Sequence, residues 1–199
     1  MIYFNKDTVS SWLFVAGMIA LMIILQLFDI HALRYQYDWL PKTEYWRLLS
    51  AHWIHVNWMH LALNAAGLLL CMAIATPRWK IREWIVYNLI LASGISILFS
   101  LRNPHLGWYA GYSGVLFGIY FLAAVDLYRR EKLIALLLGA AISIKVILEQ
   151  WSDLKVTSSD LIGTPVIIDA HLYGLVLGIS IALAQRAYTI GHRGAKTGA

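Results

Sequence analysis

The stretch WYAGYSGVLFGIYFLAAV, residues 108–125, is apolar over most of its length and carries Ser113 close to two glycines near its start. A helix that crosses a bilayer needs about 20 mostly apolar residues, so this stretch is predicted to be a membrane span. Five other stretches share this character, which predicts an all-α, polytopic membrane protein. The six predicted spans are Ser10–Phe28, Val56–Thr76, Trp84–Leu101, Trp108–Val125, Leu133–Trp151 and Pro165–Ala184.

The composition of the 199-residue chain also indicates a membrane protein. Hydrophobic residues make up 60% of the chain and charged residues 14%, and the mean hydropathy is +0.64. A soluble domain carries about 25% charged residues, so this composition excludes a soluble globule, and its high apolar content excludes disorder. The single cysteine, Cys71, excludes an intramolecular disulfide and a cysteine-based metal site.

The chain is expected to form one domain over residues 1–199, with short tails and no large soluble part. The first span is expected to be retained, because no small-residue cleavage site follows Phe28. The stretch Asp29–His55 is rich in Trp, Tyr and His, which favour the membrane interface. It is predicted to be an external loop that rests at this interface.

The distribution of basic residues predicts the orientation. With a cytoplasmic N-terminus, ten of the 16 lysines and arginines lie on the inner side and five on the outer side, while Lys145 lies within a span. Positive residues concentrate on the cytoplasmic side, so both termini are predicted to be cytoplasmic. A net charge of +5 can also indicate a nucleic-acid partner, but in so apolar a chain it is interpreted as this cytoplasmic bias, and no nucleic-acid partner is expected. The inner residues are Lys6, Arg78, Lys80, Arg82, Arg129, Arg130, Lys132, Arg186, Arg193 and Lys196, and the outer residues are Arg34, Lys42, Arg47, Arg102 and Lys155.

Polar side chains inside the predicted spans are costly in lipid and indicate where chemistry takes place. His60 and Asn64 are four residues apart and share one helix face. Ser113 lies early in the fourth span, and His171 lies early in the sixth. All four lie a few residues from the external ends of their spans, roughly 5–12 Å below the outer surface. A shared depth on three helices predicts a common site.

Glycine spacing predicts that the fourth and sixth spans pack closely. Gly114 and Gly118 form one small-xxx-small pair, and Gly174 and Gly178 form another. His171 precedes Gly174 by three residues, so its imidazole is expected on the packing face, near the serine of the fourth span. A serine hydroxyl becomes a nucleophile when a neighbouring imidazole accepts its proton.

This pairing predicts a serine hydrolase site that needs no metal or organic cofactor. Donors to the oxyanion are expected from the Ser113 amide at a helix N-terminus and from His60 and Asn64. Asp169 is two residues from His171 and points elsewhere on a helix, so the site is expected to lack a carboxylate. The alternatives are a serine that only packs and a His60–Asn64 pair that only clamps two helices.

Lys145 and Glu149 form a second polar pair, four residues apart in the fifth span. An ion pair reduces the cost of burying both charges, and this structural role is the default interpretation. The competing hypothesis is that Glu149 and Gln150, near the external end of the span, belong to a substrate site, for which Tyr173 of the sixth span is a further candidate.

Three motifs resemble those of the rhomboid intramembrane serine proteases: HLALN at residues 60–64, GYSG at 111–114 and AHLYGLVLG at 170–178. They occur in the family order on the expected helices, and the similarity extends over nearly the whole chain. The resemblance implies a six-helix rhomboid-like bundle with an interfacial first external loop.

The same resemblance implies roles for single residues. Ser113 corresponds to the nucleophile and His171 to the base, and the oxyanion hole corresponds to His60, Asn64 and the Ser113 amide. The other implied positions are Trp46 and Arg47, which stabilise the first loop, His55, for which a structural hydrogen bond is expected, and Tyr173, near the usual place of an aromatic spacer against the catalytic histidine.

A narrower similarity is to the rhombosortases, a compact six-helix bacterial branch, through the short chain, KVILEQ at residues 145–150 and PVIIDAHLYG at 165–174. Such enzymes cleave C-terminal sorting signals made of a Gly-Gly-type motif, an apolar helix and a basic tail. The resemblance implies membrane-anchored protein substrates, a bacterial inner membrane location and an active site that opens to the periplasmic side.

Three other functions stay open at this point. A general rhomboid protease cleaves other single-span proteins, and an inactive rhomboid-like protein only binds membrane clients. A small transporter also uses intramembrane His and Asn residues, although the sequence has no inverted repeat of the expected kind.

Overall fold

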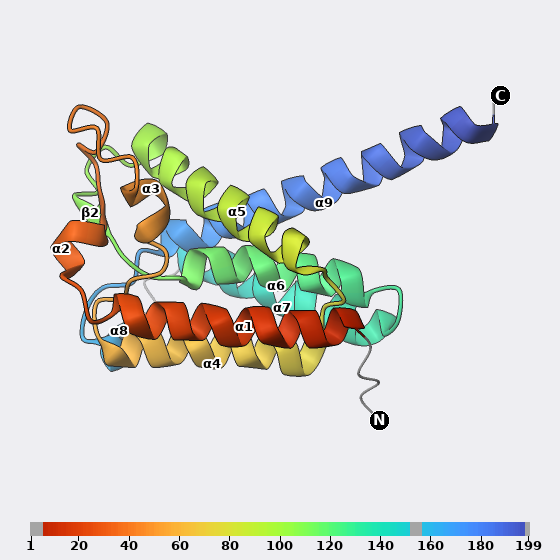
Figure 1. Ribbon diagram of the computed structural model, residues 1–199, viewed down its shortest axis with the longest axis horizontal. Helices are drawn as coiled ribbons and strands as arrows, with labels where there is room; N and C mark the ends of the chain where they lie inside the picture. Colours follow the sequence, from red (N-terminus) through yellow and green to blue (C-terminus); the bar gives the residue numbers. More distant parts are fainter. Residues whose placement is uncertain (1–5, 152–156, 198–199) are drawn as a thin grey trace.

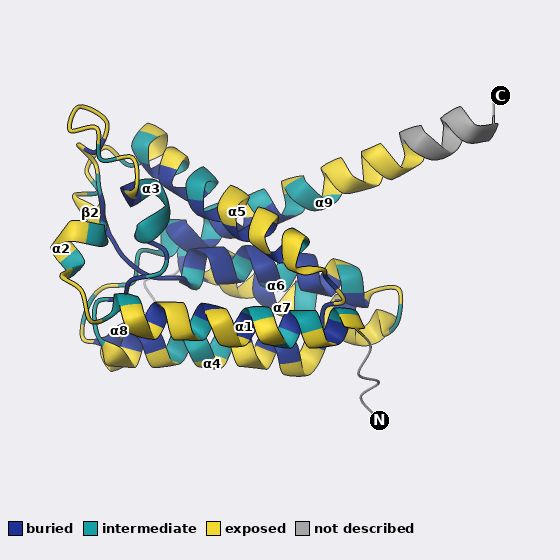
Figure 2. Ribbon diagram, viewed as in Figure 1, coloured by how far each residue is buried: buried dark blue, intermediate teal, exposed yellow. Residues whose placement is uncertain are grey.

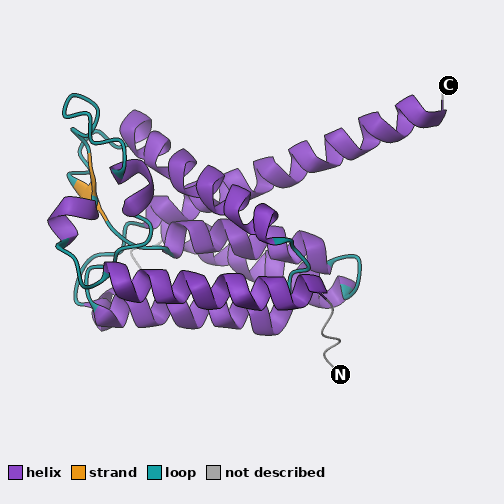
Figure 3. Ribbon diagram, viewed as in Figure 1, coloured by secondary structure: helices purple, strands orange, loops and turns teal. Residues whose placement is uncertain are grey.

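The computed structural model describes residues 6–151 and 157–197, with side chains described for 6–151 and 159–190. Lys155 and the side chains of Arg193 and Lys196, used above for the orientation, lie outside these ranges. Figures 1 and 3 show helices joined by loops, with one short strand pair. The elements are α1 (Lys6–Leu25), α2 (Ile30–Leu33), β1 (Tyr35–Gln36), α3 (Arg47–Ser50), α4 (Trp58–Ala75), α5 (Ile81–Arg102), β2 (Trp108–Tyr109), α6 (Ser113–Leu127), α7 (Lys132–Trp151), α8 (Thr157–Ile162) and α9 (Ile168–Thr197).

The described residues include five helices long and apolar enough to cross a bilayer, namely α1, α4, α5, α7 and α9 as far as Ile190. The sixth apolar helix, α6, has 15 residues. Large apolar side chains remain exposed on α1, α4, α5 and α7, and such faces suit lipid. Figure 2 colours the exposed residues of these helices yellow. The prediction of an all-α, multi-pass membrane protein is therefore confirmed.

The first predicted span is displaced, because α1 covers Lys6–Leu25 and not Ser10–Phe28. Two other predicted spans begin three or more residues before their helices. The fourth helix begins at Ser113 and not at Trp108, because Trp108 and Tyr109 pair with β1 and Gly111 has a φ of 137°. The sixth begins at Ile168, three residues after Pro165, and α9 then continues past the bundle. Both errors arise because apolar loop residues beside a helix are indistinguishable from helix residues by hydropathy alone.

Helix α6 lies at the centre of the bundle and packs most extensively against α9. The two glycine pairs make this approach possible. A Cβ atom on Gly174 would lie 1.9 Å from the carbonyl oxygen of Gly114, and one on Gly178 would lie 2.9 Å from that of Gly118. Because a side chain at either position meets backbone, only glycine permits the two helices to lie so close.

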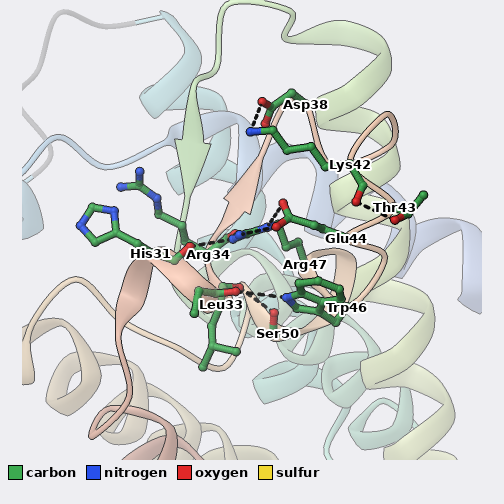
Figure 4. Close-up of polar contacts among 11 residues, drawn as sticks. His31, Leu33, Arg34, Asp38, Lys42, Thr43, Glu44, Trp46, Arg47 and Ser50 are labelled. Carbon is green, nitrogen blue, oxygen red and sulfur yellow. Dashed lines mark hydrogen bonds and ion pairs between the residues drawn. The ribbon is translucent and has the colours of Figure 1, made fainter.

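The segment between α1 and α4 is held by polar contacts of Arg47 and Trp46. Arg47 is 5% exposed and donates to both carboxylate oxygens of Glu44 and to the carbonyls of His31 and Arg34 (Figure 4). The Trp46 indole donates to the Ala32 carbonyl at 3.1 Å. A guanidinium with five donors satisfies several carbonyls of an irregular segment at once, so Arg47 stabilises this loop.

Two buried histidines in the turn between α3 and α4 are expected to make the stability of the protein depend on pH. His52 and His55 are both fully buried, and burial lowers the pKa of each imidazole from 6.5 to about 3. Between pH 6.5 and about pH 3, the two imidazoles bind protons in the unfolded chain but stay neutral in the folded protein. We therefore expect the free energy of unfolding to be highest above pH 6.5 and to fall toward pH 3, by up to about 1.4 kcal/mol per pH unit for each histidine.

Unfolding in detergent micelles at about pH 7.5, 5.5 and 4.5 measures this loss. The His52 Nε2 atom lies 3.0 Å from the hydroxyl of Ser96, which itself donates to the Leu48 carbonyl. His52→Gln keeps an N–H for Ser96 and removes the titrating ring, so it is expected to reduce the slope. Parallel pH profiles for the two proteins would contradict the assignment.

Candidate active site

The structure brings Ser113 and His171 together. Ser113 begins α6, His171 lies in the first turn of α9, and the histidine Nε2 atom is 3.0 Å from the serine Oγ atom. The imidazole is 3% exposed and stacks on the Phe117 ring, with centroids 4.3 Å apart and planes 22° from parallel. The close packing of α6 against α9 sets this geometry, because both side chains project from the ends of these helices that meet at Gly114 and Gly174.

A carboxylate also contacts the histidine, contrary to the expectation of a site without one. Glu149 of α7 places its Oε2 atom 2.7 Å from the Nδ1 atom of His171 and its Oε1 atom 2.5 Å from the Nζ atom of Lys145. The predicted Lys145–Glu149 ion pair is thus present, and it forms part of a chain of contacts from Lys145 to Ser113. Gln150 does not join this chain, since its buried Nε2 atom has no hydrogen-bond partner among the described residues.

Asp169 and Tyr173 belong to a separate hydrogen-bonded cluster around Asn103. Asn103, which caps α5, donates to the Asp169 carboxylate at 2.6 Å and accepts from the Tyr173 hydroxyl at 2.6 Å. The Tyr173 ring packs on Phe99, with centroids 5.7 Å apart. The aromatic neighbour of the histidine is therefore Phe117 and not Tyr173. Phe117 is four residues after Ser113, so helix periodicity alone indicated that both share one face.

His60 and Asn64 lie on the first turns of α4, facing the serine. The Asn57 side chain caps this helix by accepting from the His60 amide at 2.9 Å, and the Asn64 amide donates to the His60 carbonyl at 3.2 Å. The side chains of His60 and Asn64 line a cavity of about 140 Å³ together with Ser113 and His171. This cavity thus brings the side chains of His60 and Asn64 close to the Ser113 hydroxyl and to the positive N-terminal end of α6. Stabilisation of an oxyanion requires such a grouping of N–H donors beside the nucleophile.

The segment before Ser113 is anchored to the first loop. Residues 35–36 pair antiparallel with 108–109, and the Gly111 amide donates to the Ala51 carbonyl at 2.9 Å. The Tyr109 hydroxyl donates to the Gly111 carbonyl at 2.7 Å, and burial raises its pKa, so the hydroxyl keeps its proton. Through these contacts, the first loop, which Arg47 stabilises, holds the start of α6 in position.

A second, mostly apolar cavity of about 300 Å³ adjoins the serine. It lies between the segment that leads into α6 and the connection from α8 to α9, and it reaches His60 and Ser113. Its walls include Val56, Trp108 and Ile162. An extended, apolar peptide segment fits such a space beside a nucleophile.

Gly111 is expected to tolerate no side chain. Its φ of 137° is a conformation that other residues rarely adopt, and a Cβ atom there would lie 2.5 Å from the His60 ring. Gly111→Ala is therefore expected to displace His60 and to lower the reactivity of Ser113 by about 10²-fold. The rate of Ser113 labelling by a fluorophosphonate measures this effect. The control is Gly139→Ala, because Gly139 has open space around it, and equal rates in the two variants would refute the prediction.

Comparison with known proteins adds one finding to this geometry. A family model described as the Rhomboid domain matches residues 42–188. The match spans the chain from the first loop to the exposed part of α9, and it includes His60, Asn64, Ser113, Glu149 and His171. None of the curated proteins compared with the chain matches it.

Proposed function

The chain belongs to the rhomboid family, and we propose on that ground that it is an intramembrane serine endopeptidase with Ser113 as nucleophile and His171 as base. Members of this family are in general intramembrane proteases. The observation that carries the proposal is the 3.0 Å separation between the serine Oγ and the histidine Nε2 atoms. Hydrogen-bonded contact between a nucleophile and a base is the minimum requirement of this chemistry.

In the proposed reaction the Ser113 oxygen bonds to the carbonyl carbon of the scissile peptide, and its proton passes to His171 Nε2. The carbonyl oxygen becomes an oxyanion, which accepts hydrogen bonds from the Ser113 amide, His60 and Asn64. The histidine then gives its proton to the leaving amine, which departs as the peptide C–N bond breaks. Water, deprotonated by the same histidine, hydrolyses the acyl-enzyme and restores the serine.

The substrates are proposed to be membrane-anchored proteins with a Gly-Gly-type motif before a C-terminal apolar helix, as in the rhombosortase branch. A helical peptide hides its carbonyls in backbone hydrogen bonds, so the scissile segment must be extended, and glycine favours unwinding. The small cavity of about 140 Å³ at Ser113 supports a scissile segment without bulky side chains. The proposed setting is a bacterial inner membrane, with cytoplasmic termini and the site facing the periplasm.

Co-expression with C-terminally anchored candidate proteins tests the function. Mass spectrometry of the released C-termini is expected to show cleavage beside the Gly-Gly motif with the wild type and none with Ser113→Ala. Release of substrates that lack the motif indicates a general rhomboid protease. Absence both of release and of fluorophosphonate labelling at Ser113 means an inactive binding protein and overturns the proposal.

A further inference from the structure

We propose that Glu149 is a positioning residue that makes the site a Ser113–His171–Glu149 triad. This inference rests on the proposed function. It starts from the 2.7 Å contact between the Glu149 Oε2 and His171 Nδ1 atoms, on the side of the ring opposite the serine. The sequence does not predict this contact, because Glu149 and His171 lie on different helices, α7 and α9, which meet only in the folded bundle.

The carboxylate determines which ring nitrogen carries the proton. A neutral imidazole has one N–H, an ionised carboxylate only accepts hydrogen bonds, and a serine hydroxyl either donates or accepts. The proton of His171 therefore lies on Nδ1 and points at Glu149. Nε2 is left with a lone pair toward Ser113, 3.0 Å away, which is the tautomer that a general base needs.

Lys145 keeps the carboxylate ionised and in place. Its Nζ atom contacts the other oxygen of Glu149, at 2.5 Å, so both oxygens are held and the carboxylate cannot rotate away from the ring. The Glu149 side chain is 6% exposed, whereas that of Lys145 is 51% exposed, so the ammonium stays partly solvated. A buried carboxylate with two charge-assisted partners is stable as the anion.

The Glu149 carboxylate stabilises the charge that forms on His171 during proton transfer. When the serine proton moves to Nε2, the ring becomes an imidazolium, and the carboxylate beside Nδ1 stabilises that positive charge. The Phe117 ring, stacked 4.3 Å away, supplies no such charge and only limits how the imidazole tilts. Loss of the Glu149 charge is therefore expected to slow the chemical step without changing how substrate binds.

Glu149→Gln tests the role in the purified full chain, with Asp169→Asn as the matched control. Asp169 is a carboxylate close to the histidine in sequence, but it bonds to Asn103. Three quantities are measured: the rate of Ser113 labelling by a fluorophosphonate, and kcat and KM for a transmembrane peptide with a Gly-Gly motif. For Glu149→Gln we expect labelling and kcat to fall about 10²-fold or more, with KM within about twofold; Asp169→Asn should stay within about twofold on all three.

A spectroscopic measurement on the wild type tests the inference even if the Glu149→Gln variant does not fold. The Nδ1 proton of His171, bonded to a carboxylate, is expected to give a low-field ¹H NMR resonance in the wild type and in Asp169→Asn. Absence of this resonance from the wild type overturns the inference. So does a Glu149→Gln protein with normal labelling and a raised KM, which would instead make Glu149 a substrate-site residue. If wild-type Ser113 is not labelled while the resonance is present, the proposed function fails and the contact itself stands.

Discussion

His171→Ala is expected to lower kcat by about 10⁴-fold or more while leaving KM nearly unchanged. The imidazole is the only base within hydrogen-bond distance of the Ser113 hydroxyl among the described residues. Without it the serine proton has no acceptor, and the leaving amine has no donor. The loss should appear in the chemical step, because the apolar cavity beside the serine does not depend on the imidazole.

Steady-state cleavage of a labelled transmembrane peptide in detergent micelles measures both constants. His31→Ala is the control, since that histidine is exposed and uses its backbone carbonyl, not its ring, to bind Arg47. The control is expected to keep wild-type kcat. Residual activity of His171→Ala above about one tenth of wild type would remove the histidine from the mechanism.

Gly174→Ala is expected to damage both stability and activity. The added methyl group would lie 1.9 Å from the Gly114 carbonyl oxygen, and this atom belongs to backbone that cannot turn aside. Helices α6 and α9 must then separate, at a cost of roughly 3 kcal/mol. Separation by about 1 Å also pulls the His171 imidazole from the Ser113 hydroxyl and is expected to lower kcat about 10²-fold.

The matched control for this change is Gly139→Ala in α7. Nothing lies within 4 Å of a Cβ atom at Gly139, so the same substitution meets no backbone. We expect it to leave the unfolding temperature and the labelling of Ser113 unchanged or slightly higher, because alanine favours helix over glycine. Similar behaviour of the two variants would show that the contact of α6 with α9 is looser than described.

Much of the architecture was predictable because lipid imposes simple requirements on a chain. Apolar stretches of sufficient length must become helices there, and this made the all-α, multi-pass class evident from residues such as those of α5 and α7. The family prediction is confirmed by the match over residues 42–188. The glycine spacing also predicted which two helices lie closest, since backbone approach depends on residue size alone.

Other features were beyond reach because they depend on the loops and on helix rotation. Hydropathy assigned Trp108 to a helix, whereas pairing with residues 35–36 makes it part of a strand. The resemblance left open whether Tyr173 packs against the histidine, and in the structure its ring packs on Phe99 and its hydroxyl bonds to Asn103. The signals available for Glu149 were its place two residues before the end of the fifth span and its spacing of four residues from Lys145.

Apolar spans and short motifs were enough to predict a helical membrane protein of the rhomboid family with Ser113 and His171 on neighbouring helices. The contact of Glu149 with the imidazole and the stacking of Phe117 on it became evident only from the folded bundle. The difference arises because burial in lipid is a property of each segment alone. The rotation of α7 about its own axis, which aims one carboxylate at one ring nitrogen, depends on the packing of every helix around it.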